Sequence, residues 1–308
     1  MKLGEVWATV KDTASDWSDD NASRLAAALA YYSLLSLAPL MVIIIAISGF
    51  FLGPDAARGR VAGELGAIVG GPAARGIESV VQSAQSPSAG VVSTIVGIVT
   101  LFVGASGVFG ELQSSLNTIW EVKPKPGRGI LGEIKARFIS FTMVLGVAFL
   151  LLVSLVLSAV LSSVGSTFSD LLPGGEALWQ GVNFVFSLAV VTLLFALIFK
   201  YIPDVEIEWR DVWLGAVVTA VLFTIGKFLL ALYLGKAAVG SAYGAAGSLI
   251  ALVVWVYYAA QILFMGAEFT QTQARRRGHE IKPSESAVRV DSPTQTGNKS
   301  ERRPAVQS

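Results

Sequence analysis

Six apolar stretches, each close to the length that a helix needs to cross a lipid bilayer, constrain this chain more than any other feature. They cover Leu25–Leu52, Val91–Gly110, Phe138–Val164, Val182–Phe199, Val212–Leu234 and Ser248–Phe269. A hydrocarbon core of about 30 Å needs about 20 helical residues. Four of the stretches contain no Asp, Glu, Lys or Arg, and the other two carry only Lys227 and Glu268. The sequence therefore predicts an all-α, polytopic membrane protein with a bundle of six transmembrane helices.

The composition limits the kinds of partner and site that the chain can have. The chain has 308 residues, of which 53% are hydrophobic and 15% are charged, whereas soluble domains carry about 25% charged residues. A net charge of +1 argues against a nucleic-acid-binding surface. The absence of cysteine excludes disulfides and thiolate metal ligands, and we expect no cofactor.

Lys and Arg are distributed unequally between the two predicted sides of the membrane. Of the 23 Lys and Arg residues, 18 fall on the side that holds the two termini and the second and fourth loops, and 4 fall on the other side. Basic residues are retained on the cytoplasmic side of a membrane. We therefore expect both termini to be cytoplasmic.

The chain outside the six stretches divides into three parts. Residues 1–23 show apolar residues at helical spacing and predict an amphipathic helix, which lies on the inner leaflet or packs on the underside of the bundle. Residues 24–272 form the six-helix domain, with a helical hairpin expected against the outer face in the loop 53–90. Residues 273–308 are polar and predict a disordered tail. Glycines recur along the second stretch and predict close packing of that helix against another, as at Gly104 and Gly107.

Lys227 is the strongest candidate for a functional residue. It lies about 22 Å along the fifth stretch, where a charge is costly and usually faces the bundle interior or a wet cavity. The alternative is that its side chain reaches the nearer interface. Its partners in a translocation or ligand path would come from Tyr243, Ser241, Gln261 and Tyr31.

Three charged residues fall at the inner ends of predicted helices. An ion pair between Arg24 and either Glu111 or Glu268 would close a cytoplasmic vestibule. Ordinary interfacial charge on helix ends is the competing interpretation.

The fourth loop offers acids but no strong metal signature. Asp204, Glu206 and Glu208 alternate with apolar residues, so an extended chain would place the three carboxylates on one face. Solvated loop charge is favoured over a divalent cation site there, and we predict no metal site. The single histidine, His279, lies in the predicted tail and is not expected to be catalytic.

Several motifs together resemble the YihY/BrkB family of bacterial inner-membrane proteins. They are Ala28–Pro39, Gly107–Gln113 with Asn117–Trp120, Phe199–Asp204 with Trp209–Ala216, and Gly240–Ser248 with Trp255–Tyr258 and Gly266–Phe269. The resemblance implies a six-helix protein of the bacterial inner membrane. Family members carry the labels ribonuclease BN and virulence factor. The sequence shows no metal-ligand spacing or acid–base pair for RNA hydrolysis, so we predict that the protein is not an enzyme.

The first functional hypothesis is a transporter or permease of unknown substrate, because transporters use buried charges and Gly-interrupted membrane segments. The alternative is a non-transporting envelope scaffold or lipid-interacting protein, and a tRNA-processing ribonuclease is the least favoured. The expected partners are the lipid bilayer and an unknown small molecule or lipid, not nucleic acid. A homo-oligomer is left open.

Overall fold

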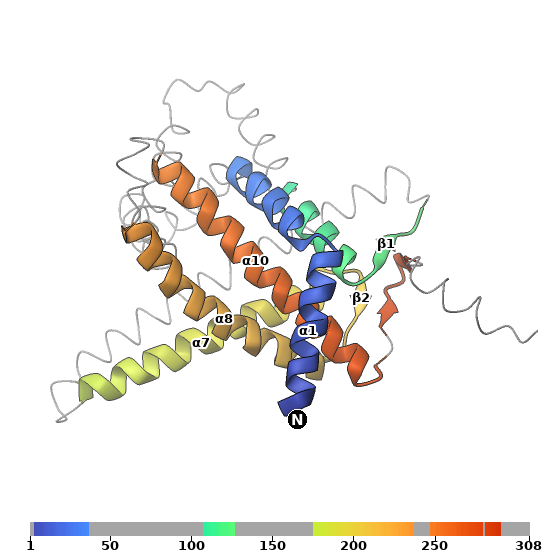
Figure 1. The fold of residues 1–308 in the computed structure, drawn as a ribbon. Helices are drawn as coiled ribbons and strands as arrows, with labels where there is room; N and C mark the ends of the chain where they lie inside the picture. Colours follow the sequence, from blue (N-terminus) through green and yellow to red (C-terminus); the bar gives the residue numbers. More distant parts are fainter. Residues whose placement is uncertain (1–2, 37–106, 127–174, 237–246, 280, 291–308) are drawn as a thin grey trace, which may run out of the picture.

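The computed structural model describes residues 3–36, 107–126, 175–236, 247–279 and 281–290. Four helices have defined bounds in this part of the chain: α1 (Leu3–Asp19), α7 (Gly175–Tyr201), α8 (Trp209–Lys236) and α10 (Gly247–Arg276). Residues 22–36 and 107–119 are also helical. Four short strands complete these segments: β1 (Val122–Pro124), β2 (Val205–Glu206), β3 (Lys282–Pro283) and β4 (Ala287–Arg289). The described residues are therefore mostly helical, with small strands that the all-α prediction left out (Figure 1).

Among the described residues, three helices are long and apolar enough to cross a membrane. The qualifying segments are Gln180–Tyr201, Trp209–Leu230 and Leu249–Arg276. They correspond to the fourth, fifth and sixth predicted spans, which are thereby confirmed as apolar helices. The first two predicted spans are described only at residues 25–36 and 107–110, and the third span and the outer hairpin lie outside the described residues. The count of six spans stays a prediction.

Helices α8 and α10 approach each other so closely that no side chain fits at their contact points. A Cβ atom added to Gly266 would lie 1.9 Å from Oγ1 of Thr219, and one added to Gly215 would lie 1.8 Å from Oγ1 of Thr270. Farther along α8, a Cβ on Gly226 would lie 2.5 Å from the hydroxyl oxygen of Tyr258 on α10. The two threonines satisfy their hydroxyls inside their own helices, on the carbonyls of Gly215 and Gly266. Small residues thus form a seam between α8 and α10, as is common where helices associate in lipid.

The main hydrophobic core lies toward one end of the bundle. Its largest fully buried side chains are Trp120, Phe199 and Phe264, which come from three separate helical segments. Phe195 on α7 joins this core to α8 through an edge-on contact with Phe223, with ring centroids 5.7 Å apart. Aromatic pairs of this geometry contribute about 1 kcal/mol beyond the area they bury. The core therefore fixes the ends of the helices at the place where the charged residues described below gather.

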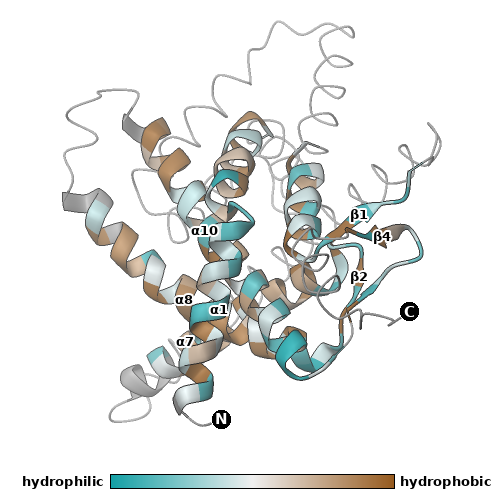
Figure 2. Ribbon diagram, turned by 45° about the vertical axis from the view of Figure 1, so that its right-hand side comes forward, coloured by the Kyte–Doolittle hydropathy of each residue, from teal (hydrophilic) through white to brown (hydrophobic). Residues whose placement is uncertain are grey.

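We call this place the charged end of the bundle. It comprises α1, the first turn of α8, the last two turns of α10 and strands β1 to β4, and these elements lie together in Figure 1. In Figure 2 brown, hydrophobic colouring predominates along α7 and α8, whereas teal gathers around α1 and beside the strands. From the distribution of Lys and Arg we expect this end to face the cytoplasm.

Helix α1 packs on α10 through a polar face. Thr9 and Thr13 are buried, and both donate hydrogen bonds to carbonyls one turn earlier in α1. The apolar side chains in the first half of α1, Val6, Trp7 and Val10, are exposed, whereas Trp17 near its end packs against the hydrophobic core. One face of α1 thus contacts the bundle, and contact of the other face with the inner leaflet stays a prediction. The helix ends at Asp19.

The structure describes residues 273–279 and 281–290, so the predicted disorder does not hold for these parts of the tail. Helix α10 continues through polar residues to Arg276. Strand β4 then pairs antiparallel with β1, and β3 pairs antiparallel with β2. The residues after α10 therefore tie together two loops that are more than 80 residues apart in the sequence. Hydropathy alone could not reveal this, because these residues are held by backbone pairing.

Candidate functional site

No hydrogen bond or ion pair joins the residues predicted for a translocation path in the described part of the chain. Lys227 is half-buried in α8, and no ion pair or hydrogen bond of its side chain occurs among the described residues. Gln261 is half-buried on α10, and its amide oxygen is enclosed without a partner. Tyr31 is exposed and packs edge-on against Tyr32. Ser241 and Tyr243 lie outside the described residues, so the path itself stays a prediction.

The predicted cytoplasmic ion pair does not form among the described residues. Arg24 is exposed and Glu111 is half-buried, and neither makes a salt bridge there. Burial raises the pKa of the Glu111 carboxyl above its usual value. Glu268, the third member of the predicted set, is fully buried beside other acids instead of beside Arg24.

Glu268 is the most unusual side chain at the charged end. It is fully buried in α10, and neither of its carboxyl oxygens has a hydrogen-bond partner of ordinary length in the described structure. Its carboxyl lies close enough to that of Asp20 to influence it, and Asp16 is also near. Enclosing an unpaired carboxylate costs several kcal/mol unless a proton or a cation neutralises it. The half-buried Asp20, in the turn after α1, and the fully buried Glu268 of α10 therefore form an acid pair.

The groups around this acid pair include some that raise the pKa of Asp20 and some that lower it. Together these effects raise the pKa of Asp20 from 3.8 to about 6, and burial is the largest of them. The contact with Glu268 and the positive charge of Arg275 lower the pKa, while the negative charges of Glu121 and Asp16 raise it. Arg275 is shared with the neighbouring acids, since it lies 3.2 Å from Glu121 and 3.8 Å from Asp16. Acids thus outnumber bases around the pair.

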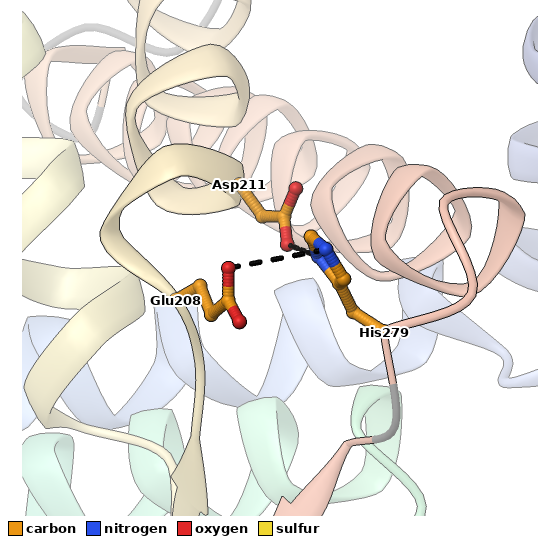
Figure 3. A group of neighbouring side chains, drawn as sticks. All are labelled: Glu208, Asp211 and His279. Atoms are coloured by element: carbon orange, nitrogen blue, oxygen red, sulfur yellow. Dashed lines mark hydrogen bonds and ion pairs between the residues drawn. The ribbon is translucent and has the colours of Figure 1, made fainter.

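A second cluster joins the first turn of α8 to the chain that follows α10. The Asp211 carboxylate is almost fully buried, 2.7 Å from the Arg277 guanidinium and 2.6 Å from Nδ1 of His279. Nε2 of the same imidazole lies 3.9 Å from a carboxylate oxygen of Glu208, which is exposed (Figure 3). These three residues could offer one ligand atom each to a metal ion. They line part of a cleft of about 810 Å³.

Local backbone structure explains why these side chains meet. Glu208 is the N-cap of α8, because its carbonyl accepts from the amides of Asp211 and Val212. Asp211 then occupies the third position of the helix, where the helix dipole favours an acid. At the other end, Gly278 has a φ of 74° and ends α10 in a Schellman motif, with the His279 amide donating to the carbonyl of Ala274. The turn directs His279 back toward α8.

The acids of the fourth loop diverge, contrary to the arrangement that an extended loop would give. Asp204 accepts a hydrogen bond from Nδ2 of Asn117 at 2.9 Å, and its backbone amide donates to the Asn117 side chain at 2.8 Å. Glu206 lies in β2, and only Glu208 faces the imidazole. The three carboxylates therefore do not share one site.

A comparison of the sequence with known protein families gives the same family as the motifs. The family described as Virulence factor BrkB matches residues 13–291, which is most of the chain. The chain belongs to this family. The assignment covers every element described above except the first turns of α1.

Curated relatives of this BrkB-family chain are named chiefly as membrane proteins. A UPF0761 membrane protein of Rhodospirillum centenum is 25% identical over 91% of this chain and 60% of its own length. A UPF0761 membrane protein of Verminephrobacter eiseniae is 28% identical over 86% of this chain and 62% of its own length. The chain thus spans about three fifths of these relatives. No solved structure matches it.

One relative carries a different name. The "putative ribonuclease-like protein YfkH" of Bacillus subtilis is 24% identical over 87% of this chain and 96% of its own length. The comparisons establish a membrane protein of the BrkB family, and the names of its relatives do not agree on an activity.

Sequence reasoning missed both clusters. Asp16 and Asp20 fall in the segment 1–23 predicted as an amphipathic helix, and His279 falls in the predicted tail. Asp211 and His279 are 68 residues apart, and no periodicity links them. The available signal was the buried position of Glu268, an acid inside an apolar stretch, which requires a neutralising partner.

Proposed function

We propose that this BrkB-family protein is a permease of the bacterial inner membrane that moves a small solute in exchange for, or together with, protons. The observation that carries the proposal is Glu268, a fully buried carboxyl in an apolar helix, whose oxygens have no hydrogen-bond partner of ordinary length among the described residues and which lies beside Asp20. Ionisable groups in such positions characterise proton relays in pumps and transporters.

The acid pair supports proton coupling through its electrostatics. Two carboxyls in contact resist double ionisation, so the pair favours holding at least one proton. An opening of the contact between α1 and α10 would hydrate Glu268 and release that proton to the cytoplasm. A conformational change that alters burial is therefore coupled to proton binding, which is the thermodynamic requirement for a proton-driven permease.

Proteoliposomes provide the test. Purified wild-type protein would be screened for uptake of a solute panel under an imposed pH gradient. We expect at least one solute to accumulate only when the gradient is present. In Glu268→Gln, a neutral mimic of the protonated acid, gradient-driven uptake should fall about 100-fold while exchange of the same solute across the membrane persists.

Asp12→Asn is the matched control, since Asp12 is an exposed acid of α1 that pairs with Arg276 outside the acid pair. It should transport at the wild-type rate. Gradient-driven uptake by Glu268→Gln at the wild-type rate would refute the role of the acid pair.

A second candidate, a lipid-interacting protein, is favoured by an aromatic cluster beside the cleft. Tyr201, Trp209 and Trp213 are exposed and lie ring against ring, and the Lys200 ammonium lies 5.8 Å from the Trp209 ring. Tryptophan and tyrosine concentrate at membrane interfaces. Anionic lipids retained in native mass spectrometry by wild type, and lost in Lys200→Gln with Trp209→Ala, would favour this function over transport.

The ribonuclease-like name of YfkH keeps a nuclease as the third candidate. RNA hydrolysis needs a metal cluster or a positioned acid and base in a basic groove. The divergence of Asp204, Glu206 and Glu208 weighs against it. Incubating the purified protein with tRNA, with and without Mn²⁺, tests it directly, and we expect no cleavage above that of a mock purification.

A further inference from the structure

The Asp211–His279 contact defines which nitrogen of the imidazole is free. A carboxylate only accepts hydrogen bonds, so the 2.6 Å contact requires Nδ1 of His279 to carry the proton. In the neutral imidazole, Nε2 then has an unprotonated lone pair. A buried acid that orients an imidazole through Nδ1 is the arrangement by which proteins prepare a histidine to bind a metal through its other nitrogen.

The environment of Asp211 strengthens this assignment. Its second oxygen is held by Arg277 at 2.7 Å, so the carboxylate is fixed and its charge is balanced by the guanidinium. Asp211 therefore has an ion-pair partner without a protonated His279. Both oxygens of Asp211 are thus occupied, by Arg277 and by Nδ1 of His279, and Nε2 is the imidazole nitrogen left to face Glu208.

We propose that His279 Nε2 and the Glu208 carboxylate bind a divalent transition-metal ion of the Zn²⁺ type at the charged end, with Asp211 positioning the imidazole. The two ligand atoms are 3.9 Å apart. Two ligands on a tetrahedral zinc ion lie about 3.3 Å apart, given bonds of about 2.0 Å. Glu208 is exposed, so a small rotation of its side chain closes the difference.

The ligand types select the class of ion. Imidazole with carboxylate suits Zn²⁺, Mn²⁺, Fe²⁺ and Ni²⁺, whereas Ca²⁺ and Mg²⁺ prefer oxygen ligands only. The cleft of about 810 Å³ leaves room for the water molecules that complete the coordination. Three cations also line the cleft, namely Lys200, Arg210 and Lys282. They oppose a bound cation, so we expect an affinity in the micromolar range, well below that of a structural zinc site.

The bound ion would bridge two parts of the chain. Glu208 precedes α8, and His279 follows α10. The ion would therefore fasten the chain after α10 to the start of α8, across the open side of the cleft. This role is independent of the proposed transport function, because it involves neither Asp20 nor Glu268.

The composition of the chain makes the test unusually direct. His279 is the only histidine and there is no cysteine, so histidine-selective ¹⁵N labelling gives one imidazole in the full-length protein, purified with a tag free of both residues. Before metal is added, we expect Nδ1 to be protonated and Nε2 to be bare at pH 8. Zn²⁺ titration should then shift the Nε2 resonance with saturation in the micromolar range.

Variants separate a metal site from a simple charge contact. Glu208→Gln should weaken Zn²⁺ binding about tenfold or more, measured by the same resonance and by calorimetry. His279→Gln should abolish the calorimetric signal. Glu206→Gln is the matched control, because Glu206 is an exposed acid that lines the same cleft from β2, and it should bind like wild type.

Three results would overturn the proposal. One is an Nε2 resonance that does not respond to millimolar Zn²⁺, and another is protonation of Nε2 with a bare Nδ1. The third is equal loss of affinity in Glu206→Gln and Glu208→Gln, which would reduce the cluster to general attraction of cations by surface acids.

Discussion

The seam between α8 and α10 and the charged end of the bundle are held together in opposite ways. The seam brings glycine and threonine backbones into contact, and its hydroxyls are satisfied within each helix. The charged end holds buried acids whose partners come from segments far apart in the sequence, such as Asp211 with Arg277 and His279. The seam depends on shape, so it is insensitive to pH. The charged end depends on protons and counter-ions, so it can respond to conditions.

The largest loss of stability is expected from a substitution in the seam. Gly266→Ala places a methyl group 1.9 Å from Oγ1 and 2.9 Å from Cβ of Thr219. The two helices must move apart to make room for it. We expect the free energy of unfolding to fall by about 3 kcal/mol, the upper end of the usual range for overpacked sites. Thermal unfolding of the detergent-purified protein measures the loss, which should not change with pH.

Two further variants test whether the loss comes from the close contact between the helices. Thr219→Gly should restore part of the stability of Gly266→Ala, because it removes the obstructing atoms. Gly181→Ala on α7 meets nothing within 4 Å and should be neutral. Equal losses at Gly181 and Gly266 would show that the seam is not specially close.

The next largest loss of stability is expected at the charged end. Arg277→Met removes the guanidinium partner of Asp211, a buried carboxylate that then retains only His279. We expect a loss of about 2 kcal/mol, because an uncompensated buried charge is costly. Arg276→Met, at the adjacent residue, breaks only an exposed pair with Asp12 and should cost less than about 0.5 kcal/mol. Similar melting temperatures for the two variants would contradict the central role of Asp211.

A smaller effect should depend on pH. Burial, together with the neighbouring charges, raises the pKa of Asp20 from 3.8 to about 6, so the folded protein binds more protons than the unfolded chain between these values. Stability should therefore fall as pH rises through this window. Asp20→Asn removes the penalty and should be more stable than wild type at pH 7.5 by about 1 kcal/mol, after allowance for solvent screening.

The difference between Asp20→Asn and wild type should vanish near pH 4, which unfolding curves recorded from pH 4 to 8 would reveal. Asp19→Asn alters the exposed neighbouring acid and should follow wild type throughout. An Asp20→Asn protein that is less stable than wild type at pH 7.5 would show that the ionised carboxylate stabilises the fold.

The smallest effect concerns the second predicted span. A Cβ on Gly107 would lie 3.2 Å from Cδ1 of Tyr32, a side chain that is partly exposed and can move. Gly107→Ala should cost less than about 1 kcal/mol. Gly110→Ala, with nothing within 4 Å, should be neutral or slightly stabilising. A loss at Gly107 as large as that at Gly266 would mean that the seam extends to this helix.

The same contrast explains what could be predicted from the sequence. Apolar length marks a membrane helix directly, so the spans in α7, α8 and α10 were found, and the glycine spacing of the second span anticipated the contact of Gly107 with Tyr32. Hydropathy could not show that α10 continues to Arg276, because that part of the helix is stabilised by α1 and not by lipid.

The contacts at the charged end could not be predicted from the sequence, for a physical reason. Its contacts join residues without a common period, such as Glu121 with Arg275 and Asp204 with Asn117. Each of these side chains is a plausible surface residue when taken alone. Only the meeting of several chain segments reveals that Glu268 is enclosed and that His279 faces Glu208.

The pairing of the chain after α10 with two earlier loops also sets an order of events during biosynthesis. Strands β1 and β2 leave the ribosome long before β3 and β4, and they must wait for their partners until every helix described here has been made. Nascent protein would thus present unpaired strand edges until residues 282–289 have been made. A ribosome that stops between α10 and β3 would release a protein whose described helices are complete but whose two loops are unfastened, a distinctive substrate for membrane proteases.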